Sequence, residues 1–416
     1  MRLLHTADWH LGQTFHNYDR EYEHACFLDW LAVQIRERKP DALLVSGDVF
    51  DSVNPPASAQ RLYYDFLKRA NDAHPGLQIV VTAGNHDAAA RLEAPAPLLH
   101  RFKAVVVGTV ERTAEARIDY SKFLVPLRNV SGKVAAIVLA VPFLRTGDLP
   151  QVSGVQDTYT AGVSAFYQQL TAHACTLRDA EHPEAALIAM GHCHLSEGAE
   201  SRDSERRLVV GGLESLSATT FPKELAYVAL GHLHKPQSFD DGRVQYSGSP
   251  IPLSFTEKGY LHRVCECEFG PAGLLLQRSL EIPRTVGLVS LPKGKAIPMT
   301  ELEQLLRNED FGAAALSQKH PFLEVRYLDD GPDPTRRYRV EQALAGKPVR
   351  LANTKFEARE PASDAARAGE AEDLGDLNAL DPLEVLLAAY HERYEGAQPE
   401  PAVLAAFREI LSEVNE

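Results

Sequence analysis

The chain of 416 residues is long enough for two or three domains of ordinary size. Its 44% hydrophobic and 24% charged residues exclude collagen-like, coiled-coil and wholly disordered classes of protein. The net charge of −14 is concentrated near the C-terminus: residues 357–416 carry 15 acidic and 4 basic side chains, which leaves 42 acidic and 39 basic ones, a balance of −3, for residues 1–356. The total charge therefore excludes no polyanionic partner for the main part of the chain.

Short apolar runs alternate with helical patterns over the first 270 residues, which predicts an α/β fold. One helical pattern spans residues 22–35, with large apolar side chains at helical spacing. Several of the apolar runs lack polar alternation, which is typical of strands covered on both faces. The predicted strands lie at residues 3–7, 42–48, 78–84, 103–108, 134–141, 186–191, 207–212 and 227–231.

The second half of the chain changes character after Pro283. Residues 240–285 predict a turn and alternating strands that complete the first domain. A β-α-β pattern then predicts a small separate domain, and an acidic, alanine-rich stretch has the composition of a flexible linker. Two short amphipathic helices follow, which either fold back on the main body or dock onto another protein. The expected divisions are residues 1–282, 283–356, 357–381 and 382–416.

The longest apolar run, residues 134–144, is much shorter than the roughly 20 residues that a membrane-spanning helix needs. The first residues lack the basic, apolar and small-residue regions of a signal peptide. Five cysteines without a C-x-x-C spacing fit a reducing compartment. We therefore expect a cytoplasmic protein with no membrane partner.

Polar clusters follow five of the predicted strands directly. The carboxyl ends of strands line the ligand crevice of an α/β sheet, so clusters that are distant in sequence can converge on one site. An i, i+2 spacing in two of the clusters sends both of their side chains to the same side. The clusters are Asp8 with His10; Asp48; Asn85, His86 and Asp87; His192; and His232 with His234.

Seven of these side chains are hard or borderline metal ligands, which is too many for one tetrahedral zinc ion. They suit two divalent ions, because a carboxylate can bridge such a pair at roughly 3.5–4 Å. Mixed His, Asp and Asn ligation favours Mn, Fe or Zn over Ca. Asp48 follows its glycine alone and is the candidate bridge.

Each cluster taken singly has an ordinary structural explanation. D-x-H is common in loops, and G-D-x-x-D is a common turn in which Asp48 would bond local backbone. His192 competes with the nearby His194 for the same role, and the Gly-His order alone favours His192. The interpretation depends on the ordered set, with every member at the end of a strand.

In this order, D-x-H, G-D-x-x-D, G-N-H-D, G-H and G-H-x-H resemble the motifs of the calcineurin-like metallophosphoesterases. The resemblance implies an α/β protein built on a β-sandwich flanked by helices, with a small α+β capping domain and C-terminal helices. The wider contexts HTADWHLG, SGDVFD, TAGNHD and ALGHLHKPQ resemble, more narrowly, the bacterial SbcD family of nuclease subunits. Members of that family work with an SbcC-type ATPase that carries a coiled coil.

The resemblance also implies roles for single residues. His86 becomes the candidate acid, oriented by Asp87, whereas Asp51 stands where archaeal and eukaryotic relatives have a second histidine. The family pattern implies two manganese ions, with magnesium as the alternative. It places one ion on Asp8, His10, Asp48 and His234 and the other on Asp48, Asn85, His192 and His232.

The function that the resemblance implies is an exonuclease and endonuclease that processes DNA ends, hairpins and single strands in recombination, repair and replication. It also implies a homodimer, for which the apolar side chains of residues 60–70 would provide a surface unless they pack into the core. A phosphodiesterase for small substrates and a scaffold without enzymatic activity are the alternatives. The first leaves the added domain unexplained, and the second should have lost ligands that are all present here.

Overall fold

The computed structural model describes residues 1–152, 154–155, 157–201, 216–271, 273–313, 316–329, 333–358 and 404. Residues Met1–Ala358 form one compact unit. The predicted strand at 207–212 lies outside the described residues, as do the predicted linker and helical pair, apart from residues 357, 358 and 404. The predicted divisions of the chain into domains therefore stay predictions.

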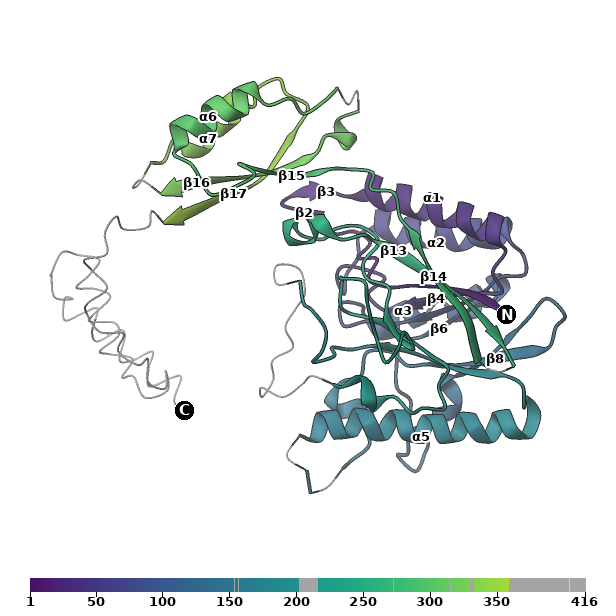
Figure 1. Ribbon diagram of the computed structural model, residues 1–416. Helices are drawn as coiled ribbons and strands as arrows, with labels where there is room; N and C mark the ends of the chain where they lie inside the picture. The colour runs from purple at the N-terminus through teal and green to yellow at the C-terminus, as the bar shows by residue number, and fades with distance from the viewer. Residues whose placement is uncertain are drawn as a thin grey trace. The chain divides into compact units, whose positions relative to one another are not determined.

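Two mixed six-stranded sheets form the centre of this unit (Figure 1). In each sheet four consecutive strands run parallel: β1, β4, β5 and β6 in the first, and β12, β10, β9 and β8 in the second. The first sheet has the order β14 (Gly273–Glu281), β13 (Arg263–Gly270), β1 (Arg2–Thr6), β4 (Ala42–Ser46), β5 (Gln78–Thr82), β6 (Ala104–Val107). The second has the order β11 (Gln237–Phe239), β12 (Val244–Tyr246), β10 (Tyr227–Gly231), β9 (Ala186–His192), β8 (Val134–Ala140), β7 (Leu124–Arg128).

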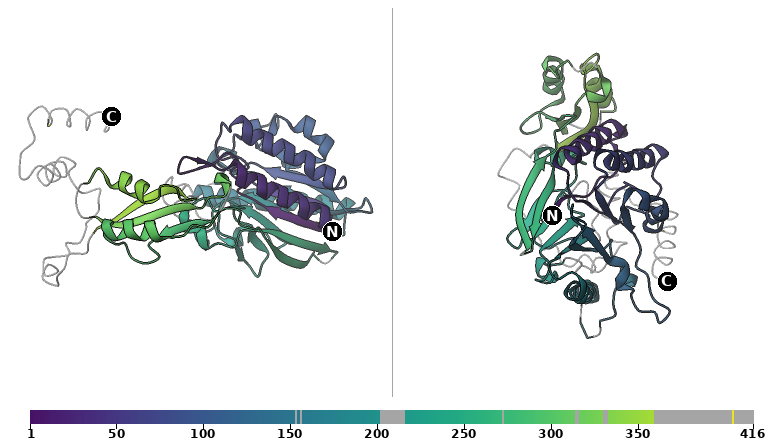
Figure 2. Two further views of the ribbon diagram at one scale, coloured as in Figure 1. Left: turned by 90° about the horizontal axis from the view of Figure 1, so that it is seen from above. Right: turned by 90° about the vertical axis from the view of Figure 1, so that its right-hand side faces the viewer.

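Helices cover the outer faces of the sandwich. Helices α1 (Glu21–Arg38) and α2 (Ala57–Ala73) lie side by side on the first sheet, and α5 (Thr158–Glu181) lies on the second (Figures 1 and 2). Leu43 packs with Phe27 and Phe66 under the helices, whereas its neighbour Leu44 packs in the core between the sheets. Successive side chains of a strand point to opposite faces. Both faces of β4 are covered, so both of these leucines are fully buried. The prediction of strands covered on both faces is confirmed for β4, and β9 and β10 are likewise buried along their whole length.

The charges at the ends of α1 match the helix dipole. Glu21 and Glu23 lie in its first turn, and Arg36 and Arg38 lie in its last turn. Lys39 then ends the helix in a left-handed conformation. Along the chain, a hairpin of β2 (Thr14–Phe15) with β3 (Tyr18–Asp19) lies between β1 and α1, and the short helices α3 (Ala89–Glu93) and α4 (Ala96–Leu99) lie between β5 and β6.

Residues beyond Pro283 form a three-stranded parallel sheet with two helices. The order along the chain is β-α-β-α-β, so the predicted β-α-β pattern was correct but missed the last helix and strand. Leu302, Leu323 and Val340 lie in the core of this part, and Phe322 packs instead against Phe15 in a separate cluster. The elements are β15 (Leu288–Leu291), α6 (Met299–Asn308), β16 (Phe322–Asp329), α7 (Arg336–Ala343) and β17 (Arg350–Ala358).

The structure accounts for the apolar side chains of residues 60–70 without a second copy of the chain. Tyr63, Phe66, Leu67 and Ala70 are buried in the core under α2. The apolar side chains of α2 therefore give no reason to expect a dimer surface, and the homodimer stays a prediction that depends on the family resemblance. Among the described residues, no helix combines the length and the apolar character needed to cross a membrane.

Candidate metal centre

The five strands followed by polar clusters bring those clusters to one place. Strands β1, β4 and β5 run parallel in the first sheet, and β9 and β10 run parallel in the second. Their carboxyl ends carry the residues in question. The nine predicted site residues are all in the described part of the chain: Asp8, His10, Asp48, Asn85, His86, Asp87, His192, His232 and His234.

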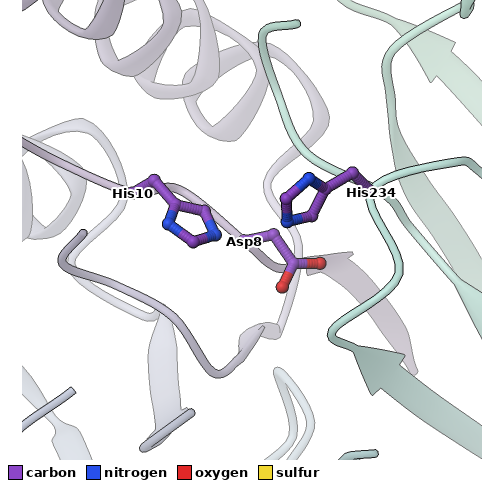
Figure 3. Close-up of side chains that lie close together, drawn as sticks. All are labelled: Asp8, His10 and His234. Carbon is purple, nitrogen blue, oxygen red and sulfur yellow. The ribbon is translucent and has the colours of Figure 1, made fainter. Parts of the chain in front are cut away.

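The loop after β1 and the loop after β10 contribute to the first cluster. The Asp8, His10 and His234 side chains point toward one another, and one ligand atom from each lies within 4.8 Å of the others (Figure 3). All three residues are buried. The Asp8 Oδ1 atom also accepts a hydrogen bond of 2.8 Å from the backbone N–H of His232, which fixes the carboxylate between two loops.

Asp48 lies at the centre of the remaining contacts. Its Oδ1 atom accepts the backbone N–H of His86 at 2.8 Å, and its Oδ2 atom lies 3.2 Å from His192 Nε2 and 3.6 Å from His10 Nε2. A Cβ atom at Gly84 would overlap the Asp48 carboxylate, so only glycine allows this approach. Asp48 belongs to two further clusters of candidate ligand atoms, one with His10 and His86 and one with Asp8 and His192.

Asn85 joins the two histidines of the second sheet. Its Oδ1 atom lies 2.9 Å from His192 Nε2 and 3.1 Å from His232 Nδ1. The other nitrogen of His192, Nδ1, lies 3.0 Å from the carbonyl oxygen of Ser46 and must donate to it. In a neutral imidazole the lone pair of His192 Nε2 therefore faces the oxygen atoms of Asn85 and Asp48.

The donor set fits divalent cations on two observations. The Asp8 Oδ2 and His10 Nε2 atoms are buried and form no hydrogen bond among the described residues. In addition, three histidines direct one ring nitrogen into the centre while the other contacts an oxygen atom: His10 Nδ1 with Asp51 at 3.1 Å, His234 Nδ1 with Glu257 at 3.1 Å, and His192 Nδ1 with Ser46. Outer hydrogen bonds of this kind orient histidine ligands in metal sites.

Comparisons with known proteins agree with this geometry. Residues 1–236 match the calcineurin-like phosphoesterase family, and residues 287–394 match a family described as the type 5 capsule protein repressor C-terminal domain. The chain is 40% identical over 395 residues to the SbcD subunit of the SbcCD nuclease from Rhodobacter capsulatus, covering 94% of each chain. It belongs to the SbcD family.

Two further relatives are similar over shorter lengths. The SbcD subunit of the Escherichia coli K12 nuclease is 37% identical over 73% of this chain and 74% of its own length. That of Bacillus subtilis is 37% identical over 64% of this chain and 65% of its own. Among solved structures, a dimetal phosphatase from Danio rerio is 12% identical, with a TM-score of 0.35, over 68% of this chain and 99% of that chain.

In this member of the SbcD family the charges of the centre perturb one another strongly. Burial opposes ionisation of Asp48, but the neighbouring His192 outweighs it and holds the pKa of Asp48 far below its usual value. Burial likewise opposes protonation of His192, yet Asp48 and Asp8 raise its pKa to about 9. Burial, together with the nearby His192, holds the pKa of His232 well below its usual value. Perturbation of this size is typical of functional sites.

The backbone at the centre is strained. Asp8, His10 and Asp48 all have positive φ angles, of 54°, 46° and 49°. Residues other than glycine adopt this left-handed region rarely, and such strain gathers at functional sites. The strained loops are tied together, because Asp8 N donates to Gly47 O at 3.1 Å and His10 N donates to Asp48 O at 3.0 Å.

The expectation that Asp87 orients His86 is wrong. His86 Nδ1 lies 2.8 Å from the backbone carbonyl oxygen of Asp51, which is the group that orients the ring. Both oxygen atoms of Asp87 accept backbone N–H groups instead: Oδ1 from Phe50, and Oδ2 from Val49 and Gly84. Asp87 therefore holds the loops of the centre in place.

His192 and His194 have different surroundings, which supports the choice between them. His192 is buried, with Nε2 directed at Asp48 and Asn85. His194 is partly exposed, and its Nε2 atom lies 3.1 Å from a carboxylate oxygen of Glu200.

Sequence reasoning missed several residues of the centre. Glu257 is fully buried against His234, but no motif marks it, and it lies in a short 3-10 helix (Phe255–Gly259) and not at the end of a strand. Phe143 follows β8, and its ring lies edge-on to His192 with centroids 6.3 Å apart. Because β8 runs parallel to β9, inspection of the carboxyl end of every predicted strand would have found Phe143.

Proposed function

We propose that this protein hydrolyses phosphodiester bonds of DNA with two divalent metal ions, as the nuclease component of an SbcCD-type complex in recombination and repair. The observation that carries the proposal is the convergence of seven candidate ligands from five strand ends. Their buried, unsatisfied atoms and oriented imidazoles fit divalent cations. The relatives are named as components of the nuclease SbcCD, which supports the nuclease activity.

The geometry supports the following distribution of ligands. Asp8, His10 and His234 would hold one ion together with Asp48, and Asn85, His192 and His232 would hold the other with Asp48 as the bridge. Mixed imidazole and oxygen ligation suits Mn, Fe or Zn, and among these the family resemblance favours Mn²⁺, with Mg²⁺ as the alternative. When bound, the two ions would neutralise the phosphodiester and activate the attacking water as Lewis acids.

His86 is the candidate acid for the leaving oxygen. Its Nδ1 atom contacts the Asp51 carbonyl and must carry a proton, so the proton available for transfer is on Nε2 when the ring is cationic. A ring nitrogen of His86 lies within 4.8 Å of ligand atoms of Asp48 and His10, which places the ring beside the centre.

We infer that the partners are DNA, including ends, hairpins and single strands, and an SbcC-type ATPase with a coiled coil, and that the protein acts in the cytoplasm. The sequence contains no G-x-x-x-x-G-K-[ST] motif, so an ATP requirement has to come from a partner.

The apolar stripes of residues 382–416 are the candidate docking segment. A chain that ends at residue 375 should lose co-purification with the ATPase and keep metal-dependent cleavage of short single strands.

The Asp48→Ala variant tests the two-metal proposal. Removal of the bridge should abolish cleavage of single-stranded and hairpin DNA and lower the number of Mn²⁺ ions bound per chain. Calorimetric titration with Mn²⁺ and a gel assay in Mn²⁺ or Mg²⁺ measure the two effects. A wild-type chain that binds no metal, or an active Asp48→Ala chain, would contradict the proposal. Turnover of small phosphodiesters without cleavage of DNA would favour the alternative enzyme class, and metal binding without any hydrolysis would favour a scaffold.

A further inference from the structure

A cavity with basic and aromatic walls lies next to the metal centre. Its volume is about 410 Å³, within the range of roughly 300–1,000 Å³ that is typical of ligand sites. Lys235, the residue after the candidate ligand His234, forms part of its wall. The other lining residues are Pro236, Gly259, Tyr260, Leu261, Arg263, Ser279 and Glu281.

Hydrogen bonds connect this cavity to His234. The Glu257 carboxylate contacts His234 Nδ1 at 3.1 Å, and the backbone carbonyl of Glu257 accepts Tyr260 N at 2.9 Å. The backbone carbonyl of His234 accepts Ser249 N at 3.1 Å, and the Ser249 carbonyl in turn contacts His262 Nδ1 at 2.7 Å. The turn at residues 259–261 is therefore held beside the metal centre from both sides.

The side chains on this turn present an aromatic ring and an apolar tip. Tyr260 is half-buried, and Lys235 Nζ lies 6.0 Å from the centroid of its ring. Leu261 is 70% exposed, although its side chain is large and apolar. Among the described residues, no carboxylate lies within ion-pair distance of Lys235, so its charge is available to a ligand.

A second cavity of about 310 Å³ borders the same turn and shares Gly259, Tyr260, Leu261 and Glu281 with the first. The basic lining residues of the two cavities are Lys235, Lys258, Arg263 and Arg284, and the acidic ones are Glu23 and Glu281. The Glu23 carboxylate already binds the buried Arg20 guanidinium through two hydrogen bonds. The surface on both sides of the turn is thus positive and suits an anionic ligand with a flat apolar part.

We propose that the first cavity, which Lys235 and Tyr260 line, is the subsite for one nucleotide of a single DNA strand, adjacent to the phosphate held at the metal centre. The proposal rests on the proposed function and extends it from the scissile bond to the neighbouring nucleotide. Lys235 attracts the phosphate, and Tyr260 and Leu261 contact the base. Arg263 adds positive charge to the wall, while its guanidinium donates to Ser279 and Gln245. Stacking on an aromatic ring is independent of base identity, because every base has a π face. The subsite therefore selects an unpaired base without selecting a sequence.

Binding of single strands tests the role of Tyr260. Fluorescence anisotropy of a labelled oligonucleotide with the full chain in EDTA measures affinity without cleavage. Tyr260→Ala should weaken binding by about 5- to 100-fold, the range expected for the loss of one stacked base. Tyr260→Phe keeps the ring and should bind like the wild type. An oligonucleotide without bases should bind equally to the wild type and to Tyr260→Ala, because neither can stack.

The salt dependence of binding tests Lys235. Loss of one phosphate contact should reduce the slope of log affinity against log salt by about 0.7 for a single strand. Lys235→Ala should show this change. Lys133→Ala is the matched control, because the exposed Lys133 pairs with Glu184, does not line the cavity and should keep the wild-type slope.

The outcomes separate this proposal from the proposed function. Equal binding of the intact oligonucleotide by Tyr260→Ala and the wild type, or an unchanged salt slope in Lys235→Ala, overturns the subsite. A loss of affinity that is equal for intact and base-free oligonucleotides also overturns it, because the variant then damages more than stacking. Failure of the proposed function would be visible elsewhere, as a wild-type chain that binds single strands in EDTA and cleaves none with any divalent metal.

Discussion

His86 and Asp87 are neighbours in sequence, but the fold gives them different tasks. The His86 ring lies beside Asp48 and His10, whereas the Asp87 carboxylate accepts hydrogen bonds from three backbone N–H groups. A similar division holds for His234 and Glu257, where the buried carboxylate fixes the imidazole. At the scale of single residues, the centre therefore combines side chains that converge on one another with side chains that position them.

The His86→Ala variant should lose turnover and keep its metal. A residue that transfers a proton in the transition state contributes about 10²–10⁴ in rate and little to metal binding. Metal content by mass spectrometry and turnover on an oligonucleotide measure the two effects side by side. The loss of one bound ion would show that His86 is a ligand, and the proposed acid role would then be wrong.

The Glu257→Ala variant should bind Mn²⁺ about 10- to 100-fold more weakly, as is typical when an outer partner of a histidine ligand is removed. Glu257 also accepts Leu253 N at 2.7 Å and Ser201 Oγ at 3.0 Å, so it is rigidly held. Glu257→Gln keeps an acceptor for His234 Nδ1 and should recover part of the affinity. Calorimetric titration measures both variants. Wild-type affinity in a folded Glu257→Ala chain would contradict the positioning role.

At the scale of elements, the loops after β1, β4 and β5 form one hydrogen-bonded unit. The loop after β1 donates to the loop after β4 through Asp8, His10 and Leu11, and Asp87 in the loop after β5 accepts from Val49 and Phe50. The three loops therefore keep their geometry jointly. This coupling explains how residues with unfavourable positive φ angles remain in place.

The Asp87→Ala variant should destabilise the fold more than the removal of one small side chain usually does. It leaves three backbone N–H groups without an acceptor in a buried place, and each such loss costs about 1–3 kcal/mol. We expect the free energy of unfolding to fall by at least about 3 kcal/mol in urea denaturation. Asp72→Ala is the control, because Asp72 pairs with Lys68 on an exposed helix surface and should cost less than about 1 kcal/mol. Equal effects of the two substitutions would contradict the role of Asp87.

At the scale of the whole molecule, the sandwich buries histidines that remain neutral. Burial lowers the pKa of His5 to about 3 and that of His262 to about 4. His5 Nδ1 contacts the Tyr227 hydroxyl at 2.9 Å in the core between the sheets. In the unfolded chain the same imidazoles accept a proton near pH 6.5. Unfolding below that pH therefore takes up protons.

The thermal stability of the chain should accordingly fall as the pH drops below about 6.5. In that range the unfolded state binds more protons than the folded state, so the free energy of unfolding decreases as the pH falls. Differential scanning calorimetry at pH 8, 6 and 5, in EDTA to remove bound metal, measures this trend. His5→Gln removes one of the titrating groups and should make the fall in melting temperature shallower. A melting temperature that is independent of pH between 8 and 5 would contradict the prediction.

The residue patterns alone predicted the α/β class, the buried strands and the residue types of the centre, whereas the arrangement as a sandwich came from the family resemblance. Strands that are buried on both faces require uninterrupted apolar runs, and polar clusters that directly follow such runs lie at the carboxyl ends of strands, where α/β sheets bind ligands. The strands could therefore be predicted without coordinates from the apolar runs that end before Asp8, Asp48, Asn85, His192 and His232. The small parallel sheet was predicted only in part, because its last helix and strand have weaker hydrophobic patterns.

The contacts of each of these side chains could be known only from the folded chain. Local sequence leaves the direction of a side chain open where the backbone adopts a left-handed conformation, as at Asp8 and Asp48. Contacts between remote segments are also absent from any local pattern: Glu257 reaches His234, and Asp87 reaches the amides of Val49 and Phe50. Periodicity, likewise, cannot tell core packing from a surface for a partner, so the burial of α2 had to be observed.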